Sequence, residues 1–331
     1  MIIATHDGSF HADETTACAI LTFLHENSTI IRSRDEIELE KADIVIDVSN
    51  KNDSKHFDHH SKDFTLCRDN GVKYATAGLM WKKFGKDYLK KVASTTNLKF
   101  TPSAKIIDMA FERIDREIMI PIDLNDNGQL TSYVHDLASP KTEGENEVLN
   151  RLSDFQSSTP DIPYLVAMMN LPSQIGQDQD KAFLQTVKIL KTLLLSAAIN
   201  AICTESGIAK VLDIYTGGQI LIMHEKYPWT QAVLNYPDVF KDCLIAVYPD
   251  RNNRWRVQSL PLSKAQRFTN RLPAPTAWRG LNDKELDAAT GLCNMTFIHK
   301  SGFTGGAMTY EDNLELAKLW LEKGLEEKNL K

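Results

Sequence analysis

The first sixty residues alternate between short apolar runs and longer amphipathic segments. Three runs are rich in β-branched residues and apolar on both faces, as in strands buried within a sheet: residues 1–5, 29–32 and 43–48. Segments with a helical pattern, residues 13–26 and 35–41, separate them. Strands that alternate with helices form βαβ units, so this part of the chain predicts an α/β domain with a mainly parallel sheet flanked by helices.

After residue 60 the pattern becomes mostly helical. Apolar positions at helical spacing predict helices over residues 76–92, 102–116 and 143–155, and a long helix over about 178–204. We expect the long helix to end at Glu205-Ser206-Gly207, because glycine commonly follows a helix C-terminus.

Short strand patterns follow the long helix. The expected elements are four strands and a final helix, at residues 208–212, 219–223, 243–248, 254–260 and 311–327. They predict an α+β domain with a largely antiparallel sheet. The predicted organisation is therefore α/β with two domains, residues 1–205 and residues 206–331, linked by the long helix.

Length and composition agree with this organisation. The chain has 331 residues, and domains of about 150 residues are common. Its five cysteines are odd in number and widely spaced, which is typical of reduced thiols in an intracellular protein. The longest apolar run, residues 193–203, is too short to cross a bilayer, and no leader pattern is seen. We expect an intracellular protein without a membrane segment, cytoplasmic by default, with the nucleus and the mitochondrion left open.

Histidines are unevenly distributed: six of the nine lie within the first 60 residues. Such clustering requires a metal or catalytic explanation. The sequence T-H-D-G-S-F-H-A-D-E, residues 5–14, stands where the first strand ends and the first helix begins. It places His6, His11 and Asp13 at the carboxyl end of a strand, where parallel α/β sheets bind ligands. A polar loop with Asp13 near a helix N-terminus is the alternative interpretation.

Two further groups follow later strands. Asp47 closes an apolar run, so its carboxylate must be paired, coordinated or exposed. Asp58-His59-His60 comes eleven residues later, and Asp58 could orient a neighbouring imidazole. A solvated loop is the alternative for an isolated His-His pair.

A fourth group, residues 123–128, begins like an EF-hand loop. Its twelfth position is Val134, where calcium binding requires a glutamate, so this interpretation fails. We interpret the segment as a turn that contributes one more carboxylate.

The candidate ligands are histidines and aspartates, without a thiolate. Such sites suit Mn²⁺ or Mg²⁺ better than structural zinc. Two ions roughly 3.5–4 Å apart are the usual device for displacement at phosphorus. The residues therefore predict phosphoester hydrolysis with two divalent cations, with Mn²⁺ preferred and Mg²⁺ as the second choice.

These motifs resemble the DHH phosphoesterase superfamily and, more closely, its Myg (melanocyte proliferating gene) family. The first half matches through T-H-D-G-S-F-H-A-D-E, I-V-I-D-V, D-H-H and D-L-N-D-N-G, and the second through R-W-R-V-Q-S-L-P, R-L-P-A-P-T-A-W-R-G-L and F-I-H-K-S-G-F-T-G-G. Family members are labelled metal-dependent protein hydrolases and described as 3′–5′ RNA exonucleases. The resemblance implies a DHH-type domain that holds the metals and a C-terminal domain that contacts substrate across a cleft.

The resemblance also implies residue roles. Asp47 would bridge two ions, His60 would face the scissile phosphate, and Asp58 would orient the histidine pair, so these three are the predicted catalytic residues. The implied metal ligands are His6, His11, Asp13, Asp47, His59 and Asp126. The chain departs from the family in one place, because Ser49-Asn50 stands where the family usually has Gly-Gly after the strand aspartate.

The net charge of −6 hides a strong segregation. Residues 250–282 contain seven basic residues and one aspartate, interleaved with Trp255, Phe268 and Trp278. Arginine forks match phosphate oxygens and aromatic rings stack on bases. We expect Arg271 and Arg279, which lie inside a matched motif, to contact phosphate. A solvated basic loop is the alternative.

The segment H-K-S-G-F-T-G-G, residues 299–306, resembles the glycine motif that the superfamily uses against substrate. Glycines let backbone N–H groups approach an anion, and basic side chains add charge. The predicted substrate-binding residues here are His299, Lys300, Gly305 and Gly306. The alternative is a plain turn before the last helix.

The leading hypothesis is a metal-dependent phosphodiesterase, specifically a 3′–5′ exonuclease whose partner is single-stranded RNA or a short oligonucleotide. A phosphatase or phosphodiesterase acting on pyrophosphate or small nucleotides is a second hypothesis. Amide hydrolysis is a weaker one, since no H-E-x-x-H motif is present. A metal-stabilised nucleic-acid-binding protein without turnover is the alternative of another class. The oligomeric state stays open, with a homodimer among the options.

Overall fold

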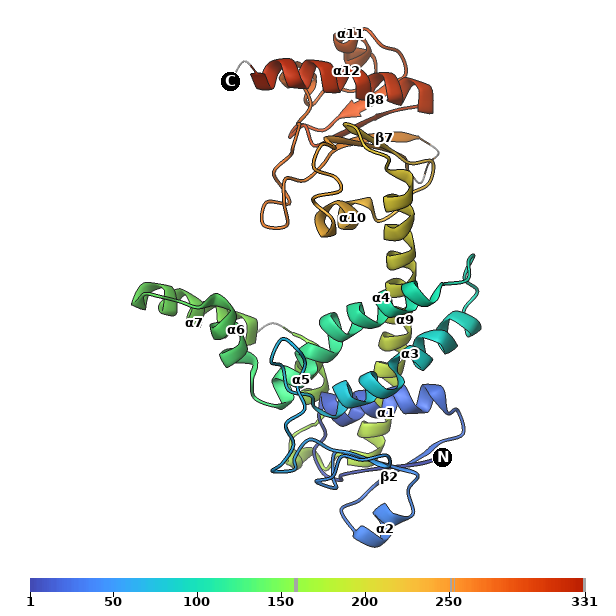
Figure 1. Ribbon diagram of the computed structural model, residues 1–331, viewed down its shortest axis with the longest axis vertical. Helices are drawn as coiled ribbons and strands as arrows, with labels where there is room; N and C mark the ends of the chain where they lie inside the picture. Colours follow the sequence, from blue (N-terminus) through green and yellow to red (C-terminus); the bar gives the residue numbers. More distant parts are fainter. Residues whose placement is uncertain (158–159, 251, 253, 330–331) are drawn as a thin grey trace. The chain divides into compact units, whose positions relative to one another are not determined.

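The computed structural model describes most of the chain (Figure 1), namely residues 1–157, 160–250, 252 and 254–329. It contains two compact units, Met1–Cys203 and Thr204–Lys331. Their boundary lies two residues from the predicted one. Arg251, counted above among the basic residues, lies outside the described residues.

The first unit is built on a four-stranded sheet in the order β2–β1–β3–β4. All neighbouring strands are parallel. The strands are β1 (Ile2–Thr5), β2 (Thr29–Arg32), β3 (Ile44–Ile46) and β4 (His56–Phe57). The three predicted strands and the parallel sheet are confirmed. Because the strands run in the same direction, the residues that follow β1, β3 and β4 all emerge at one edge of the sheet.

Helices α1 (Ala12–Leu24) and α3 (Thr76–Thr95) pack against each other in this unit, and α2 (Glu36–Glu40) precedes β3. Residues 12–21 of α1 are all buried. The small side chains at Ala17, Cys18 and Ala19 let α1 pack closely within the core.

The segment after α3 is more helical than expected. Helix α4 (Ala104–Ile114), a π-helical turn (Asp115–Met119) and α5 (Ile120–Asp126) form one nearly continuous helical run. The predicted turn at residues 123–128 is therefore wrong at its start, since helix continues through Asp126. Pro121 lies just after the widened π turn, which accommodates the backbone hydrogen bond that proline cannot donate.

The rest of the first unit is helical. Helices α6 (Leu130–Ala138), α7 (Glu143–Ser157) and α8 (Ile162–Ala167) follow, with a 3₁₀ turn at Ser173–Ile175. Asn170, after α8, accepts a hydrogen bond from Phe10 N and donates one to Phe10 O. This exchange fastens the segment to the loop that leads into α1.

The long helix α9 runs over Gln179–Ile214 and continues into the second unit. The predicted end at residues 205–207 and the predicted strand at 208–212 are wrong. Ile208 and Val211 are buried three residues apart on one helical face, in the cluster that contains Leu221. Gly207 is buried within the helix. A larger residue would clash at this position, because a Cβ there would lie 2.4 Å from Cδ of Pro228. Glycine here permits a close helix contact and does not end the helix.

By length and composition alone, α9 could cross a membrane, and it is the single helix of that kind within the described chain. Core helices of soluble proteins share this composition. Within the most apolar stretch of α9, 39% is buried inside the structure. The expectation of a chain without a membrane segment stays a prediction.

The second unit contains a five-stranded sheet in the order β5–β6–β7–β9–β8. Its strands are β5 (Ile220–Ile222), β6 (Ile245–Pro249), β7 (Trp255–Ser259), β8 (Met295–Ile298) and β9 (Thr304–Ala307). Only β5 and β6 pair in parallel, so the largely antiparallel sheet is confirmed. The sequence analysis did not predict β8 and β9; in β9, two glycines interrupt the strand pattern.

Helices complete the second unit: α10 (Trp229–Asn235), α11 (Asp283–Thr290) and α12 (Tyr310–Asn329), together with a 3₁₀ turn at Thr276–Trp278. The predicted final helix is confirmed. Trp320 and Leu316 of α12 belong to one buried cluster with Val247 and Val257 of the sheet.

Gly207→Ala tests the close helix contact. Alanine favours helix by about 1 kcal/mol over glycine, but here the new methyl meets Pro228, and overpacking typically costs about 1–3 kcal/mol. We expect a net loss of stability in urea unfolding. Gly144→Ala in α7 is the matched control, because a Cβ at Gly144 meets nothing within 4 Å; it should be neutral or stabilising. Equal effects of the two changes would contradict the packing explanation.

Candidate metal centre

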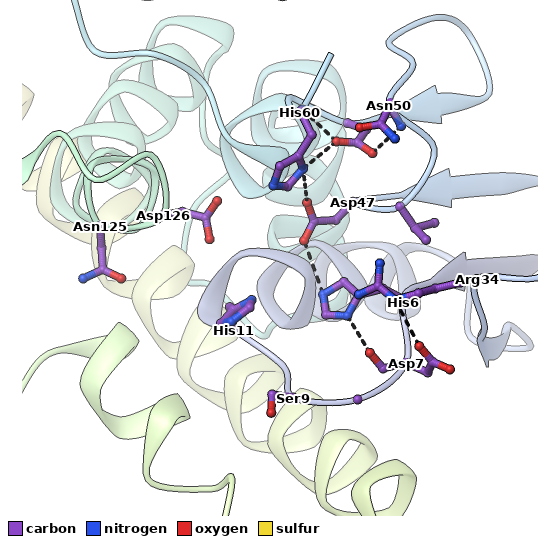
Figure 2. Close-up of a pocket in the computed structure, with 13 residues that line it drawn as sticks. His6, Asp7, Ser9, His11, Arg34, Asp47, Asn50, His60, Asn125 and Asp126 are labelled. Atoms are coloured by element: carbon purple, nitrogen blue, oxygen red, sulfur yellow. Dashed lines mark hydrogen bonds and ion pairs between the residues drawn. The ribbon is translucent and has the colours of Figure 1, made fainter. Parts of the chain in front are cut away.

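The strand ends of the first unit meet at a polar cavity of about 840 Å³. Figure 2 shows His6, His11, Asp47, His60 and Asp126 around it. They come from the loops after β1, β3 and β4, the start of α1 and the last turn of α5. The structure thus brings together groups that are more than one hundred residues apart in the sequence.

Asp47 lies at the centre of this arrangement (Figure 2). It follows β3 directly and has a φ of 56°, a left-handed conformation that aspartate adopts more readily than most residues. Its Oδ2 is 3.5 Å from Nε2 of His6, and its Oδ1 is 3.4 Å from Nδ1 of His60 and 3.8 Å from Nδ1 of His59. The two oxygens of one carboxylate therefore face two different sets of ligand groups.

The first set consists of His6, His11 and Glu14, whose donor atoms lie within 4.8 Å of one another. Glu14 is fully buried, and its Oε1 lies 3.3 Å from Nε2 of His6 and accepts a hydrogen bond from His11 N. Its Oε2 is buried without a hydrogen-bond partner in the described structure. A buried carboxylate oxygen without a partner is costly unless a cation satisfies it. The sequence prediction omitted Glu14, although it stands next to Asp13 in the first motif.

The second set consists of Asp13, His59 and Asp126. Nε2 of His59 lies 3.0 Å from Oδ2 of Asp126, and its Nδ1 lies 3.8 Å from Oδ2 of Asp13. The Asp13 carboxylate also accepts hydrogen bonds from the backbone N–H groups of Thr76 and Ala77, at 2.9 and 2.6 Å. Asp13 therefore binds the N-terminus of α3, where a helix dipole favours negative charge.

Asp58 and His60 form a fixed pair beside Asp47. The Asp58 carboxylate accepts hydrogen bonds from His60 Nδ1, His60 N and Asn50 N, at 2.8, 2.9 and 2.7 Å. Asn50 has a φ of 54°, a left-handed conformation that asparagine tolerates. His60 remains about half exposed, with a side-chain exposure of 54%. Its ring is held in place while it faces the cavity.

The carboxylates give the centre a strong attraction for positive charge. Burial lowers the pKa of His6, but the contacts with Asp47 and Glu14 outweigh it and raise that pKa to about 10. Contacts with Asp47 and Asp58 raise the pKa of His60 to about 10. Burial and the nearby carboxylates of Asp126 and Asp47 hold the pKa of Asp13 well above its usual range. Oxygen and imidazole donors, an unpartnered Glu14 oxygen and this charge fit hard divalent cations.

A buried arginine supports the second set. Arg68 Nη1 donates to Oδ2 of Asp123 at 2.7 Å, and its Nε and Nη2 donate to the Asp115 carboxylate at 2.8 and 2.7 Å. Asp123 also accepts a hydrogen bond from Gly78 N of α3, where a Cβ would lie 2.0 Å from Oδ2 of Asp123. Burial, only partly offset by Arg68, raises the pKa of Asp123 to about 7. This network fixes the end of α5 on α3, and Asp126 lies one turn further along.

Arg34 is a second residue that the sequence prediction missed. It lines the cavity just after β2, and its Nε donates to Oδ1 of Asp7 at 3.2 Å. Both side chains are largely exposed. Arg34 follows β2 of the parallel sheet, so it emerges at the same edge as the groups that follow β1, β3 and β4.

The predicted substrate arginines of the second unit make internal hydrogen bonds. Arg271 donates from Nε to Pro261 O at 3.1 Å and from Nη1 to Cys243 O at 2.9 Å and Phe240 O. Arg279 donates from Nε to Ala274 O at 2.8 Å. These bonds hold loops together, and the predicted phosphate contacts stay predictions.

The glycine motif contains strand β9. A Cβ at Gly305 would lie 2.3 Å from Ile298 Cδ1, and one at Gly306 would lie 2.3 Å from Trp255 O, so both glycines permit close strand packing. The alternative of a plain turn is therefore wrong for these two residues. Lys300 is exposed, and Nδ1 of His299 lies 2.9 Å from Oγ of Ser301. The substrate roles of the four residues stay predictions.

Comparison with known proteins places the chain in a family. The model MYG1_exonuc, described as an uncharacterised protein family (UPF0160), matches residues 2–321. The chain belongs to this family. The prediction made from the motifs is thereby confirmed.

Relatives from distant eukaryotes match nearly the whole chain. A MYG1 protein of Caenorhabditis elegans is 30% identical and covers 98% of this chain and 96% of its own length. MYG1 exonucleases of Mus musculus and Homo sapiens are 29% and 28% identical, cover 96% of this chain, and match over 84% and 85% of their lengths. The predicted enzyme class is confirmed by these relatives.

Similarity to solved structures is low. RecJ of Thermus thermophilus in complex with Mn²⁺ matches with a TM-score of 0.25 and 15% identity, over 98% of this chain and 52% of that one.

Arg68→Met tests the buried network. The change leaves two carboxylates without their cation, and breaking a buried ion pair costs about 3–5 kcal/mol. Arg151→Met is the matched control, because Arg151 pairs with Glu147 on the surface, where such pairs contribute at most about 1 kcal/mol. Chemical unfolding should show a large loss for the first variant and almost none for the second. Similar small losses in both would contradict the supporting role of Arg68.

Proposed function

We propose that this protein is a divalent-metal-dependent 3′–5′ exonuclease that hydrolyses phosphodiester bonds of single-stranded RNA or short oligonucleotides. The observation that carries the proposal is the position of Asp47, whose two carboxylate oxygens face separate sets of His, Asp and Glu donors. The exonuclease names of the mammalian relatives support it.

The residues present suit two cations on either side of Asp47. One would be held by His6, His11 and Glu14, and the other by Asp13, His59 and Asp126. All donors are oxygen or imidazole nitrogen, which favours Mn²⁺ or Mg²⁺ over metals that select thiolates.

Two divalent cations, when bound, supply an activated water and neutralise charge at phosphorus. The chain supplies the orientation. Asp58 holds His60 through Nδ1, so Nε2 is left to donate a hydrogen bond to a non-bridging phosphate oxygen. Contacts with Asp47 and Asp58 raise the pKa of His60, and a protonated imidazole at this position would balance negative charge that develops on the phosphate oxygens. Arg34 at the rim adds a guanidinium that matches phosphate geometry.

Asp47→Asn is the direct test of the centre. The amide replaces one of the two negative oxygens, so both donor sets are weakened. We expect the rate of Mn²⁺-dependent shortening of a 5′-labelled single-stranded RNA from its 3′ end to fall by about 10³-fold or more. Asp53→Asn is the matched control, because Asp53 is an exposed aspartate that also contacts a histidine, His56.

Circular dichroism must show that both variants are folded. Full nuclease activity of Asp47→Asn would refute the proposal. Hydrolysis of pyrophosphate or small nucleotides without any action on RNA would favour the second hypothesis instead.

Metal binding should also be visible without turnover. A ligand that binds only the folded state at one hundred times its dissociation constant stabilises that state by about 2.7 kcal/mol. Mn²⁺ should therefore raise the unfolding temperature of the wild type and of Asp53→Asn, and EDTA should reverse the effect. Glu14→Gln and Asp47→Asn should lose most of this increase. An equal increase in all four proteins would show that Mn²⁺ binds elsewhere.

A further inference from the structure

A basic loop of the second unit has an exposed aromatic side chain that the proposed centre does not use. Residues 262–269, L-S-K-A-Q-R-F-T, are all exposed. Phe268 is 95% exposed, the highest value among the large hydrophobic side chains that the structure describes as exposed. In Figure 1 this segment is an orange loop that extends beyond the strands of its unit. The ring of Phe268 is therefore available to a partner molecule.

The loop is closed and internally bonded. Leu262 N donates to Thr269 O at 2.8 Å, and Pro261 forms an antiparallel bridge with Asn270. Inside it, Thr269 N donates to Gln266 O at 3.1 Å. The backbone around Phe268 is therefore constrained, which reduces the entropy lost when the side chain binds a partner.

Arg271 fastens the base of this loop. Its guanidinium donates to the carbonyls of Pro261, Cys243 and Phe240, so it joins both ends of the loop region to the body of the second unit. Arg271 thereby positions the loop that carries Phe268.

The charge of the loop favours an anionic partner. Lys264 and Arg267 are exposed, and the segment 251–282 contains no aspartate or glutamate. Neither cation is paired with a carboxylate of the described residues. An exposed ring next to two available cations matches a nucleotide strand, which offers a base face and phosphates at every step.

We infer that residues 262–269 form a binding site for single-stranded nucleic acid, in which Phe268 stacks on a base and Lys264 and Arg267 contact phosphates. This inference rests on the proposed exonuclease function and adds a strand-binding element outside the metal centre. A phosphopolymer is favoured over a lipid surface because polar residues, Ser263, Gln266 and Thr269, make up much of the loop and would resist burial in hydrocarbon.

The test measures binding of a fluorescent single-stranded RNA 12-mer by anisotropy, in EDTA so that no cleavage occurs. Base stacking on an aromatic side chain contributes about 1–3 kcal/mol per base, so Phe268→Ala should weaken binding about 5- to 150-fold. Phe268→Trp, which keeps an aromatic ring, should bind the RNA about as tightly as the wild type. Tyr164→Ala is the matched control, because Tyr164 is an exposed aromatic residue with no lysine or arginine within ten positions in the sequence.

The two cations are tested through salt dependence. Each phosphate contact on a single strand contributes about −0.7 to the slope of log affinity against log salt. The double variant Lys264→Gln/Arg267→Gln should therefore flatten the slope by about 1.4. Thermal unfolding of these variants should match the wild type, since the changed side chains are exposed.

The outcomes separate the inference from the proposed function. Wild-type affinity in Phe268→Ala, with RNA cleavage by the wild type intact, would overturn the loop site alone. A wild type that neither binds nor cleaves RNA would overturn both. Loss of binding to phosphatidylserine vesicles in Phe268→Ala, with RNA binding unchanged, would overturn the site in favour of a membrane contact.

Discussion

The carboxylate of Asp47 is the constraint on which the first unit depends. A parallel sheet brings the residues after β1, β3 and β4 to one edge, and the left-handed backbone at Asp47 turns its carboxylate between His6 on one side and His59 and His60 on the other. Each of these side chains is buried or fixed by a further contact, so the distances between them are properties of the fold. A sheet with one antiparallel strand would send one of these groups to the opposite edge.

Negative charge at this edge explains why histidines are so frequent there. Asp13, Glu14 and Asp47 have no lysine or arginine partner among the described residues, whereas the nearby Arg68 is occupied by Asp115 and Asp123. Imidazoles can balance the carboxylates in two ways, as protonated cations or as neutral ligands of a metal ion. A lysine or arginine in their place would neutralise the charge permanently and exclude a metal. The histidines therefore limit the repulsion between the carboxylates when no metal is bound, and they remain able to bind a metal ion.

The sequence predicted the parallel sheet, the linking helix and most of the polar groups at the centre, because strand runs such as 43–48 and the residues after them are local signals. It missed features that depend on distant partners. The strand β4 is two residues long and is recognised by its pairing with β3. Gly207 predicts a helix end from its local sequence, but its actual partner, Pro228, lies more than twenty residues away in the chain. Glu14 stands inside the first motif, but only its burial beside His6 and His11 shows that it belongs to the centre. Arg68 has ordinary surroundings in the sequence, and only its contact with Asp123 shows what it does.

The basic segment shows that formal charge and available charge differ. Residues 250–282 have a formal excess of six positive charges, yet the structure engages Arg271 and Arg279 with backbone carbonyls and Arg256 with Asp250. The exposed cations that it describes there are Arg254, Lys264 and Arg267. A surface with so few available cations cannot obtain strong affinity from phosphates alone, since each contact is weakened by salt. Stacking on an exposed ring is much less sensitive to salt. We therefore expect Phe268 to contribute more to the free energy of binding a single strand than the number of arginines in this segment would suggest.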